Sequence, residues 1–349
     1  MRHPAIDFAS LRCIPVLEGA GESPVHGRMQ RRSATGRLDV STGYLENVLV
    51  VPELRLQLAH DAIVPQEAVT YPWTLGFEVE RSFRGKAASY EKPFDIEVSG
   101  DEICCLSNLY SRNFYHWVTE EVPRVVALEQ TGFSGKYLVL DLPSFAVQFL
   151  ALLGVAEDRI VTRINRPTLF HRAAYVSVID VTHIKHFPDL YRDSRRLLLD
   201  AVAAVPGSFP RRIWLERITG VNNTGRDLAN REEIFSILTR YGFEPVDMAS
   251  LPVAQQIACA SRAEILAGVH GAAFVHAMFL PEARGVVECY SPLFINPGIL
   301  QISQLLHLDY SMLVYDIAYH GYRHGKKVMV NGDHLELVLQ RLCSGGALY

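Results

Sequence analysis

A histidine and a glutamate one helical turn apart have the types and the spacing for acid–base chemistry. His116 and Glu120 are four residues apart, so a helix that starts after Asn113 places both on one face. An imidazole with a carboxylate one turn away is the usual equipment of a general base. A structural alternative stays open, in which His116 is a hydrogen-bonded core residue and Glu120 pairs with Arg124.

A glycine turn at residues 268–271 joins an apolar, strand-like run to a helical one. Such a turn points backbone N–H groups and the positive end of a helix at an anion, and Gly271 allows a phosphate to approach the backbone closely. His270 lies in the same turn. Glu288 is expected at the end of the next strand, at the same rim, where its carboxylate could accept hydrogen bonds from ribose hydroxyls. The alternatives are a purely structural turn and a surface acid at a strand end.

Two arginines flank the loop that follows the strand-like run 212–216. Arg217 ends that run and Arg226 lies in the polar loop 221–228. Because loops at the carboxyl ends of parallel strands line the ligand crevice, these guanidinium groups are candidates for bidentate contacts to a diphosphate. For each arginine the alternative is a solvated side chain on a loop.

Several motifs are missing from the sequence. It contains neither the dinucleotide fingerprint nor a P-loop, which disfavours nucleotide oxidoreductases and P-loop kinases. It also lacks the two-histidine zinc motif, a D-x-D pair and a G-x-S-x-G elbow, which disfavours metal-dependent transferases and hydrolases. No metal site is therefore predicted.

Apolar runs of alternating period predict the elements that position these residues. From about residue 101, strand-like and helical segments alternate, which indicates parallel sheets covered by helices. The expected strands are 103–106, 137–140, 160–161, 212–215, 244–246, 265–267, 286–288 and 312–314, and the expected helices are 114–131, 145–153, 189–204, 252–260, 272–279, 299–307 and one starting at Arg231. Pro123 predicts a kink in the first helix, because it has no N–H to donate to the carbonyl four residues earlier. Asn230 with Glu233 predicts a capping box at residue 231.

A Pro/Gly break at residues 205–210 divides the chain into two predicted domains. Residues 1–205 form the first predicted domain, in which 1–100 is irregular and β-rich and 101–205 is Rossmann-like. Residues 206–349 form the second, which is also Rossmann-like. The predicted fold class is α/β, with two Rossmann-like halves and an N-terminal mixed β-rich extension.

The composition of the chain indicates which partners and which cell compartment to expect. The 34 Lys and Arg against 38 Asp and Glu give a formal charge of −4, so no basic field exists to attract nucleic acid. The six cysteines are scattered, as in a reduced cytosolic protein. The first residues lack the apolar core of a signal peptide, and no run approaches the roughly 18 apolar residues of a spanning helix. We expect a cytoplasmic protein with at most a peripheral contact to the inner face of the membrane, and a homodimer stays open.

Four blocks of the sequence, in the same order as in the family, resemble glycosyltransferase family 61. They are Asn113-Phe114-Tyr115-His116-Trp117 through Glu120 and Val122-Pro123-Arg124; Arg211 to Arg217 with Arg226 and Asn230 to Glu233; Tyr241-Gly242-Phe243; and Val269-His270-Gly271-Ala272 with Phe279-Leu280-Pro281 and Val286-Val287-Glu288. The family includes plant xylosyltransferases, the animal O-mannose-linked N-acetylglucosaminyltransferase and many bacterial capsule-locus proteins. We expect a member of the bacterial capsular-polysaccharide type.

The resemblance implies a GT-B fold, with two Rossmann-like domains facing across a cleft, and an inverting transfer without an obligatory metal or other cofactor. The donor it implies is a nucleotide sugar, UDP-linked. By the same resemblance, the domain of residues 206–349 binds this donor and the domain of residues 1–205 is the acceptor-side domain. By position in the blocks, the donor phosphates would meet Arg217, Arg226, His270 and Gly271, the nucleoside would meet Glu288, and Asn113 is grouped with these donor-binding residues. The family usually has a second glycine and an asparagine where Ala273 and His276 stand here. These departures are expected to reshape the pocket beside the phosphates.

These observations predict an inverting, metal-independent glycosyltransferase of bacterial surface polysaccharide synthesis. Glu120 is the first choice and His116 the second for the group that deprotonates a hydroxyl of a glycan or lipid-linked saccharide acceptor. The arginines and the helix N-terminus would stabilise the departing diphosphate. Two alternatives stay open: a sugar-nucleotide epimerase on the same double-Rossmann fold, and a non-catalytic glycan-binding protein.

Overall fold

The computed structural model describes residues 1–3, 12–13, 42–52, 56–59, 62–63, 92–106, 110–176, 184, 187–216, 228–290, 295–315 and 328–344. The chain divides into two compact units, Met1–Ser194 and Arg195–Tyr349. The division falls within helix α7 (Pro188–Val202), which ends just before the Pro/Gly break. The domain boundary after residue 205 and the GT-B arrangement remain predictions.

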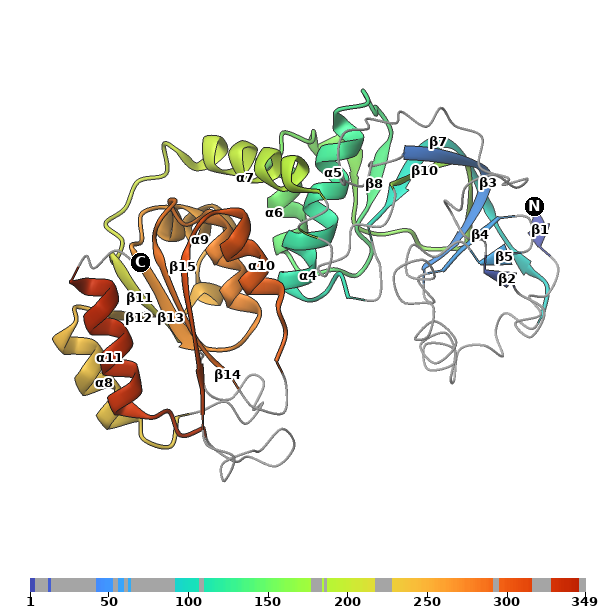
Figure 1. The fold of residues 1–349 in the computed structure, drawn as a ribbon. Coiled ribbons are helices and arrows are strands. Elements are labelled where there is room, and N and C mark those ends of the chain that lie inside the picture. The colour runs from blue at the N-terminus through green and yellow to red at the C-terminus, as the bar shows by residue number, and fades with distance from the viewer. Residues whose placement is uncertain are drawn as a thin grey trace. The chain divides into compact units, whose positions relative to one another are not determined.

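The first unit is built on an eight-stranded mixed sheet with the order β2-β5-β4-β3-β10-β7-β8-β9 (Figure 1). Its strands are β2 (Arg12–Cys13), β3 (Thr42–Val51), β4 (Leu56–Ala59), β5 (Ala62–Ile63), β7 (Glu97–Cys105), β8 (Lys136–Leu138), β9 (Ile160–Val161) and β10 (Thr168–Val176). The last four are neighbours and mutually parallel. If these four strands are numbered 1 to 4 along the chain, their order in the sheet, starting from β9, is 3-2-1-4. The strand order of a Rossmann fold begins in the same way.

Three helical segments of this unit lie where the sequence predicts them, whereas a 3₁₀ turn at residues 157–159 was not predicted. The helical elements are α4 (Phe114–His116), the π-helical turn η2 (Trp117–Glu121), α5 (Val122–Glu129), α6 (Phe145–Leu152), the 3₁₀ turn η3 (Glu157–Arg159) and the start of α7. The alternation predicted from residue 101 is thus confirmed here. One strand was missed: β10 lies between β3 and β7.

The described strands from the first 63 residues mostly continue the same sheet. β3 pairs antiparallel with β10 from Thr42↔Val176 to Val50↔Thr168, and only β1 (Arg2–His3) pairs elsewhere, with β6 (Phe94–Asp95). The side chains that β3, β7, β8 and β10 bury together form one core: Leu45, Val48, Val50, Ile103, Cys105, Leu138, Phe170, Ala173 and Tyr175. The first four residues of β3 alternate between partly buried and buried, as expected where alternate residues point to opposite faces, whereas residues 48–51 are all buried.

The second unit carries a five-stranded, all-parallel sheet with the order β12-β11-β13-β14-β15. Its strands are β11 (Arg212–Leu215), β12 (Glu244–Val246), β13 (Ile265–Val269), β14 (Gly285–Tyr290) and β15 (Asp309–Val314), and its helices are α8 (Arg231–Arg240), η5 (Met248–Ser250), α9 (Val253–Ser261), η6 (Ala272–Phe279), α10 (Gly298–Leu305) and α11 (Gly332–Cys343). Numbered along the chain, the order is 2-1-3-4-5, that of flavodoxin-like doubly wound folds. All predicted strands and helices of this half are confirmed.

Helices cover both faces of this sheet. The neighbours α8 and α11 pack on one face over Trp214, Ala267 and Val287, while α9, α10 and η6 pack together on the other (Figure 1). Two local predictions differ from the structure. The helix after the glycine turn is a 3₁₀ helix rather than an α-helix, and Asn230 makes no capping bond to the backbone of α8. The Asn230 amide instead donates to Glu233 at 2.9 Å and to the Val330 carbonyl at 2.8 Å.

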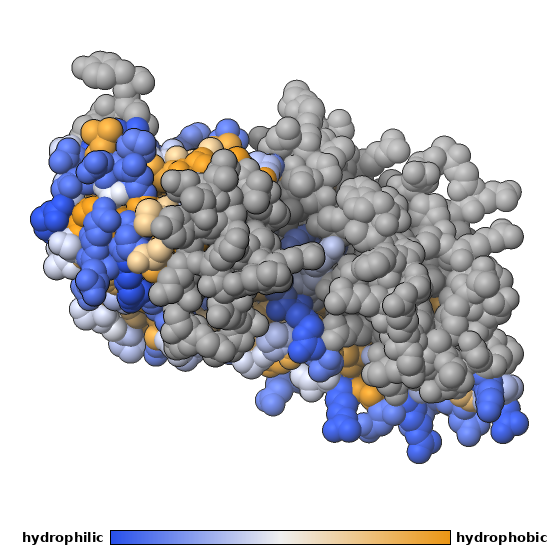
Figure 2. All heavy atoms as spheres, turned by 90° about the horizontal axis from the view of Figure 1, so that it is seen from below, coloured by the Kyte–Doolittle hydropathy of each residue, from blue (hydrophilic) through white to orange (hydrophobic). Residues whose placement is uncertain are grey.

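The surface of the described residues is mostly polar. The face in Figure 2 shows blue hydrophilic residues with smaller orange groups among them, and large exposed apolar side chains are few, among them Ile295, Met312, Val314 and Leu337. Within the described ranges, no helix combines the length and the apolar character needed to cross a bilayer.

Candidate active site

The parallel strands of each of the two large sheets have one point where their order reverses. Ligands of open parallel sheets bind outside the carboxyl ends of the strands at such points. In the first unit the reversal lies between β7 and β10, and in the second between β11 and β13. The helix that carries His116 follows β7, and His270 follows the last residue of β13. The two histidines predicted from the sequence therefore each lie at the edge of a sheet where ligands bind.

Asn113 fixes the start of the helix after β7, as predicted. Its Oδ1 accepts from the backbone N–H of Tyr115 at 2.9 Å, and its backbone is extended, as at a helix N-cap. This contact gives Asn113 a structural role in the helix that positions His116. Its membership of the donor site remains a proposal.

The kink predicted at Pro123 takes the form of a π-helical turn. Val122 N–H donates to the Trp117 carbonyl, five residues back, so the helix widens by one residue just before the proline. Pro123 has no N–H for the Thr119 carbonyl, and this carbonyl accepts instead from the Tyr191 hydroxyl of α7 at 2.6 Å. The tyrosine supplies the hydrogen bond that the proline cannot.

His116 and Glu120 form the pair that their spacing predicts. His116 Nδ1 lies 2.7 Å from Glu120 Oε1, and the His116 ring stacks on Tyr110 at 4.9 Å between centroids. The two side chains differ in exposure: 20% of the histidine side chain is accessible but only 1% of the glutamate side chain. When Nδ1 donates its proton to the carboxylate, Nε2 carries the lone pair.

The neighbouring glutamate belongs to a buried polar network. Glu121 Oε1 accepts from Ser111 Oγ at 2.8 Å and from Arg124 Nη1 at 3.0 Å. Arg124, which the structural alternative paired with Glu120, thus donates to Glu121. Burial raises the pKa of the Glu121 carboxyl to about 7, against the opposing effect of the Arg124 charge.

The second unit contains a similar pair. His270 Nδ1 lies 2.6 Å from Glu288 Oε1, and its ring stacks on Tyr290 at 4.4 Å between centroids. Glu288 Oε2 accepts from the Tyr310 hydroxyl at 2.9 Å. The expected place of Glu288 at a strand end is wrong: it is the fourth of six residues in β14 and is fully buried. Sequence reasoning missed all three tyrosines of the two clusters.

The glycine turn packs tightly against the neighbouring strand. A Cβ atom at Gly268 would lie 3.1 Å from the Cβ and 3.2 Å from the carbonyl oxygen of Leu215, so a larger residue would push β13 away from β11. Gly271 precedes η6 in an extended conformation. A 3₁₀ helix, like an α-helix, leaves the first N–H groups without intrahelical acceptors, so the turn keeps donors for an anion.

His276, one of the two departures from the family pattern, is turned into the protein. It is 1% exposed, and its Nδ1 lies 2.7 Å from the Ala273 carbonyl oxygen and its Nε2 lies 2.9 Å from Gln256 Oε1. The imidazole therefore packs between η6 and α9. The expected effect of His276 on a phosphate pocket has no support in this placement.

Arg217 and Arg226 lie outside the described residues. The described ranges contain no group of three or more His, Cys, Asp or Glu side chains that could hold a metal ion.

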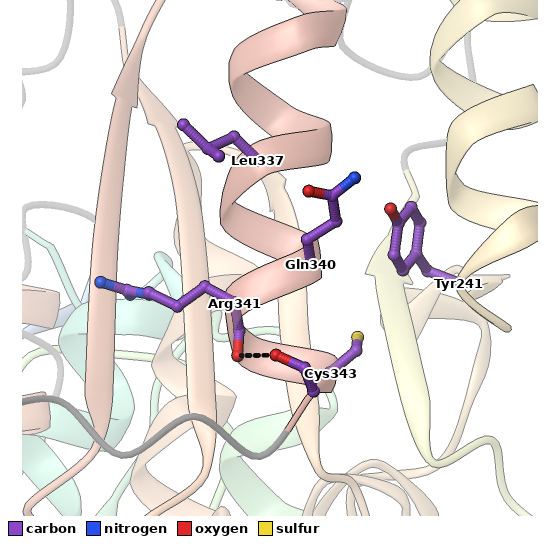
Figure 3. Close-up of a pocket in the computed structure, with 6 residues that line it drawn as sticks. Tyr241, Leu337, Gln340, Arg341 and Cys343 are labelled. Atoms are coloured by element: carbon purple, nitrogen blue, oxygen red, sulfur yellow. Dashed lines mark hydrogen bonds between the residues drawn. The ribbon is translucent and has the colours of Figure 1, made fainter.

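A groove of about 540 Å³ lies elsewhere, beside the end of α11 (Figure 3). Tyr241 and Arg341 line it, and they bond to the first residues of two strands: the Tyr241 carbonyl accepts from Arg212 at 2.6 Å and Arg341 donates to Asp309 at 3.0 Å. The groove thus lies at the amino ends of the strands, opposite the edge that carries His270.

Comparison with known proteins identifies the family. Residues 114–287 match the model of glycosyltransferase 61. The chain carries a glycosyltransferase family 61 domain. The match begins at the first residue of α4, includes His116, Glu120, His270 and Gly271, and stops one residue before Glu288. No curated protein matches the chain. The predicted family and enzyme class are confirmed: the domain is that of a glycosyltransferase, which acts on a sugar donor and an acceptor.

Proposed function

We propose that this glycosyltransferase moves a sugar from a nucleotide-sugar donor, UDP-linked, to a hydroxyl of a saccharide acceptor by a single inverting displacement. The observation that carries the proposal is the His116–Glu120 contact of 2.7 Å at the start of the helix after β7. A single displacement needs one group that takes the proton of the acceptor hydroxyl as the new bond forms.

The burial of the pair favours His116 as that base and Glu120 as the residue that orients it. Glu120 is 1% exposed, whereas a fifth of the His116 side chain reaches the surface. A carboxylate bonded to Nδ1 holds the ring in the tautomer whose Nε2 can accept a proton, and it stabilises the imidazolium that results. This assignment reverses the order of choice drawn from the sequence.

The donor phosphates are assigned to the second unit. His270, the amides at Gly271 and the side chains of Arg217 and Arg226 would stabilise the charge that develops on the departing diphosphate. The proposed reaction needs no obligatory metal ion, because the sequence has no D-x-D pair of aspartates to hold one. By its resemblance to capsule-locus members of the family, the acceptor is a glycan or lipid-linked saccharide of a bacterial surface polysaccharide, met in the cytoplasm.

The proposal is tested by incubating the protein with UDP-sugars and a panel of saccharide acceptors. We expect UDP release that depends on the acceptor, with the anomeric configuration of the product inverted by NMR. His116→Gln should lower kcat about 10²–10⁴-fold, and added imidazole should partly restore His116→Ala. The matched control is His171→Gln, an exposed histidine on β10 of the same unit, which should keep parental kcat. An epimerised sugar nucleotide formed without acceptor, or full transfer by His116→Gln, would refute the proposal.

A further inference from the structure

The carboxylate of Glu288 is engaged by the protein on both oxygens. Oε1 lies 2.6 Å from His270 Nδ1, and Oε2 accepts from the Tyr310 hydroxyl at 2.9 Å. No part of the side chain is exposed. A ribose hydroxyl could reach this carboxylate only if the surrounding side chains moved, so a direct contact to the nucleoside is disfavoured.

The tyrosines of this cluster act as donors. Burial raises the pKa of both phenols, Tyr290 and Tyr310, and the charge of Glu288 raises it further. Each hydroxyl therefore keeps its proton: Tyr310 donates to Glu288, and Tyr290 donates to the Asn296 carbonyl at 2.7 Å. The position of the carboxylate is thus set by β15 as well as by its own strand.

Two contacts hold the ring of His270, and one holds its backbone. Nδ1 contacts Glu288, and one face stacks on Tyr290 with 24° between the planes. The backbone N–H donates to the Cys289 carbonyl at 2.9 Å. The ring nitrogen on the edge away from Glu288 is Nε2. Since His270 directly precedes the amides of the glycine turn, an imidazolium, in which Nδ1 donates to Glu288 and Nε2 also carries a proton, would act with these amides on the same anion.

We propose that Glu288 is a positioning residue, which holds His270 so that Nε2 donates to a phosphate oxygen of the donor diphosphate. This inference rests on the proposed function and deepens it. It replaces the nucleoside contact that the sequence resemblance implied for Glu288. Tyr310 supports the same task by fixing the second carboxylate oxygen.

Calorimetry with two probes, inorganic pyrophosphate and UDP, separates the two roles of Glu288. His270→Gln and Glu288→Gln should each weaken the binding of both probes about tenfold, as expected for the loss of one charge-assisted hydrogen bond. The variant with both substitutions should lose little more affinity than either single variant, because both changes remove the same contact. The matched control is Glu264→Gln just before β13, where the glutamate bonds Arg211, and this variant should bind both probes as the parent does.

A spectroscopic readout distinguishes positioning from general damage to the fold. In ¹⁵N NMR of the full chain, Glu288→Gln should change the Nδ1 and Nε2 signals of His270, whereas Glu264→Gln should not. Tyr310→Phe keeps both His270 and Glu288 and serves where Glu288→Gln fails to fold. Tyr310→Phe should weaken the binding of pyrophosphate a few-fold. Unchanged pyrophosphate binding would contradict the inference.

The remaining outcomes are distinct. If Glu288→Gln weakens UDP but not pyrophosphate, Glu288 meets the nucleoside and the inference is wrong, while the proposed function stands. The inference is also wrong, and the proposed function again stands, if His270→Gln weakens the binding of the two probes and Glu288→Gln does not. If the parent protein binds neither probe, the donor site of the proposed function is wrong as well.

Discussion

At the scale of single residues, the two histidines share one arrangement. Each has Nδ1 within 2.7 Å of a buried glutamate oxygen and a ring stacked on a tyrosine with 24° between the planes. A carboxylate hidden from solvent cannot easily touch a substrate, but it fixes the tautomer and the direction of the imidazole. Burial, which spacing does not reveal, is what separates the residue that acts from the residue that orients.

His276 is also buried, and its burial predicts that the stability of the fold is sensitive to acid. Burial lowers the pKa of its ring to about 4, from an ordinary value of 6.5. Between these two values the unfolded chain binds the proton and the folded chain does not, so stability falls as the pH drops from about 6.5 to 4. The full effect would be about 3 kcal/mol. His276→Asn should flatten this part of the curve of melting temperature against pH.

The control for that measurement is His334→Asn, because His334 is exposed on α11. It should leave the slope between pH 4 and 6.5 as in the parent protein. The assignment fails if His276→Asn keeps the parental slope, since the acid sensitivity would then come from other groups.

At the scale of elements, the π-helical turn before Pro123 depends on a residue from another helix. The Tyr191 hydroxyl occupies the Thr119 carbonyl that the proline leaves without a donor. A buried carbonyl that loses its donor costs about 1–3 kcal/mol, and the turn that would shift carries Glu120. Tyr191→Phe should therefore lower both the melting temperature and kcat.

The matched control is Tyr175→Phe, which removes a buried hydroxyl that bonds Gln57 at 2.8 Å in the same unit. It should lower the melting temperature by a similar amount and leave kcat unchanged. Equal kcat in the two variants would mean that the π-helical turn does not position the site.

Sequence patterns predicted elements better than their details. Apolar periodicity located most strands and helices from residue 101 onward, because each has one face in a core. Helix α11 and the 3₁₀ turns η3 and η5 were not predicted. Periodicity also missed β10, whose place between β3 and β7 is set by tertiary pairing. It could not distinguish the 3₁₀ helix η6 from an α-helix, since i+3 and i+4 neighbours are nearly equivalent in a short apolar run. The capping box at Asn230 failed because Val330, distant in sequence, bonds the same amide.

At the scale of the whole molecule, strand order decides which predicted residues lie at ligand-binding edges. The sequence predicts alternating strands and helices, whereas the orders 3-2-1-4 and 2-1-3-4-5 come from the structure. The pair His116–Glu120 was predictable because its members are four residues apart on one helix. Tyr310 was not, because its contact with Glu288 depends on the register between β14 and β15.

Hydrogen exchange on the full chain tests the assignment of donor binding to one unit and of metal independence together. With UDP at 100 times its dissociation constant, a ligand of the folded state adds about 2.7 kcal/mol. Amides of residues 265–290 that exchange through unfolding of the second unit should therefore slow by up to about 100-fold. Peptides from 110–130 should change little, because UDP alone brings no acceptor. Excess EDTA should leave the pattern unchanged. Protection that disappears with EDTA and returns with manganese would show that a metal is required, and protection confined to 110–130 would place the donor on the first unit.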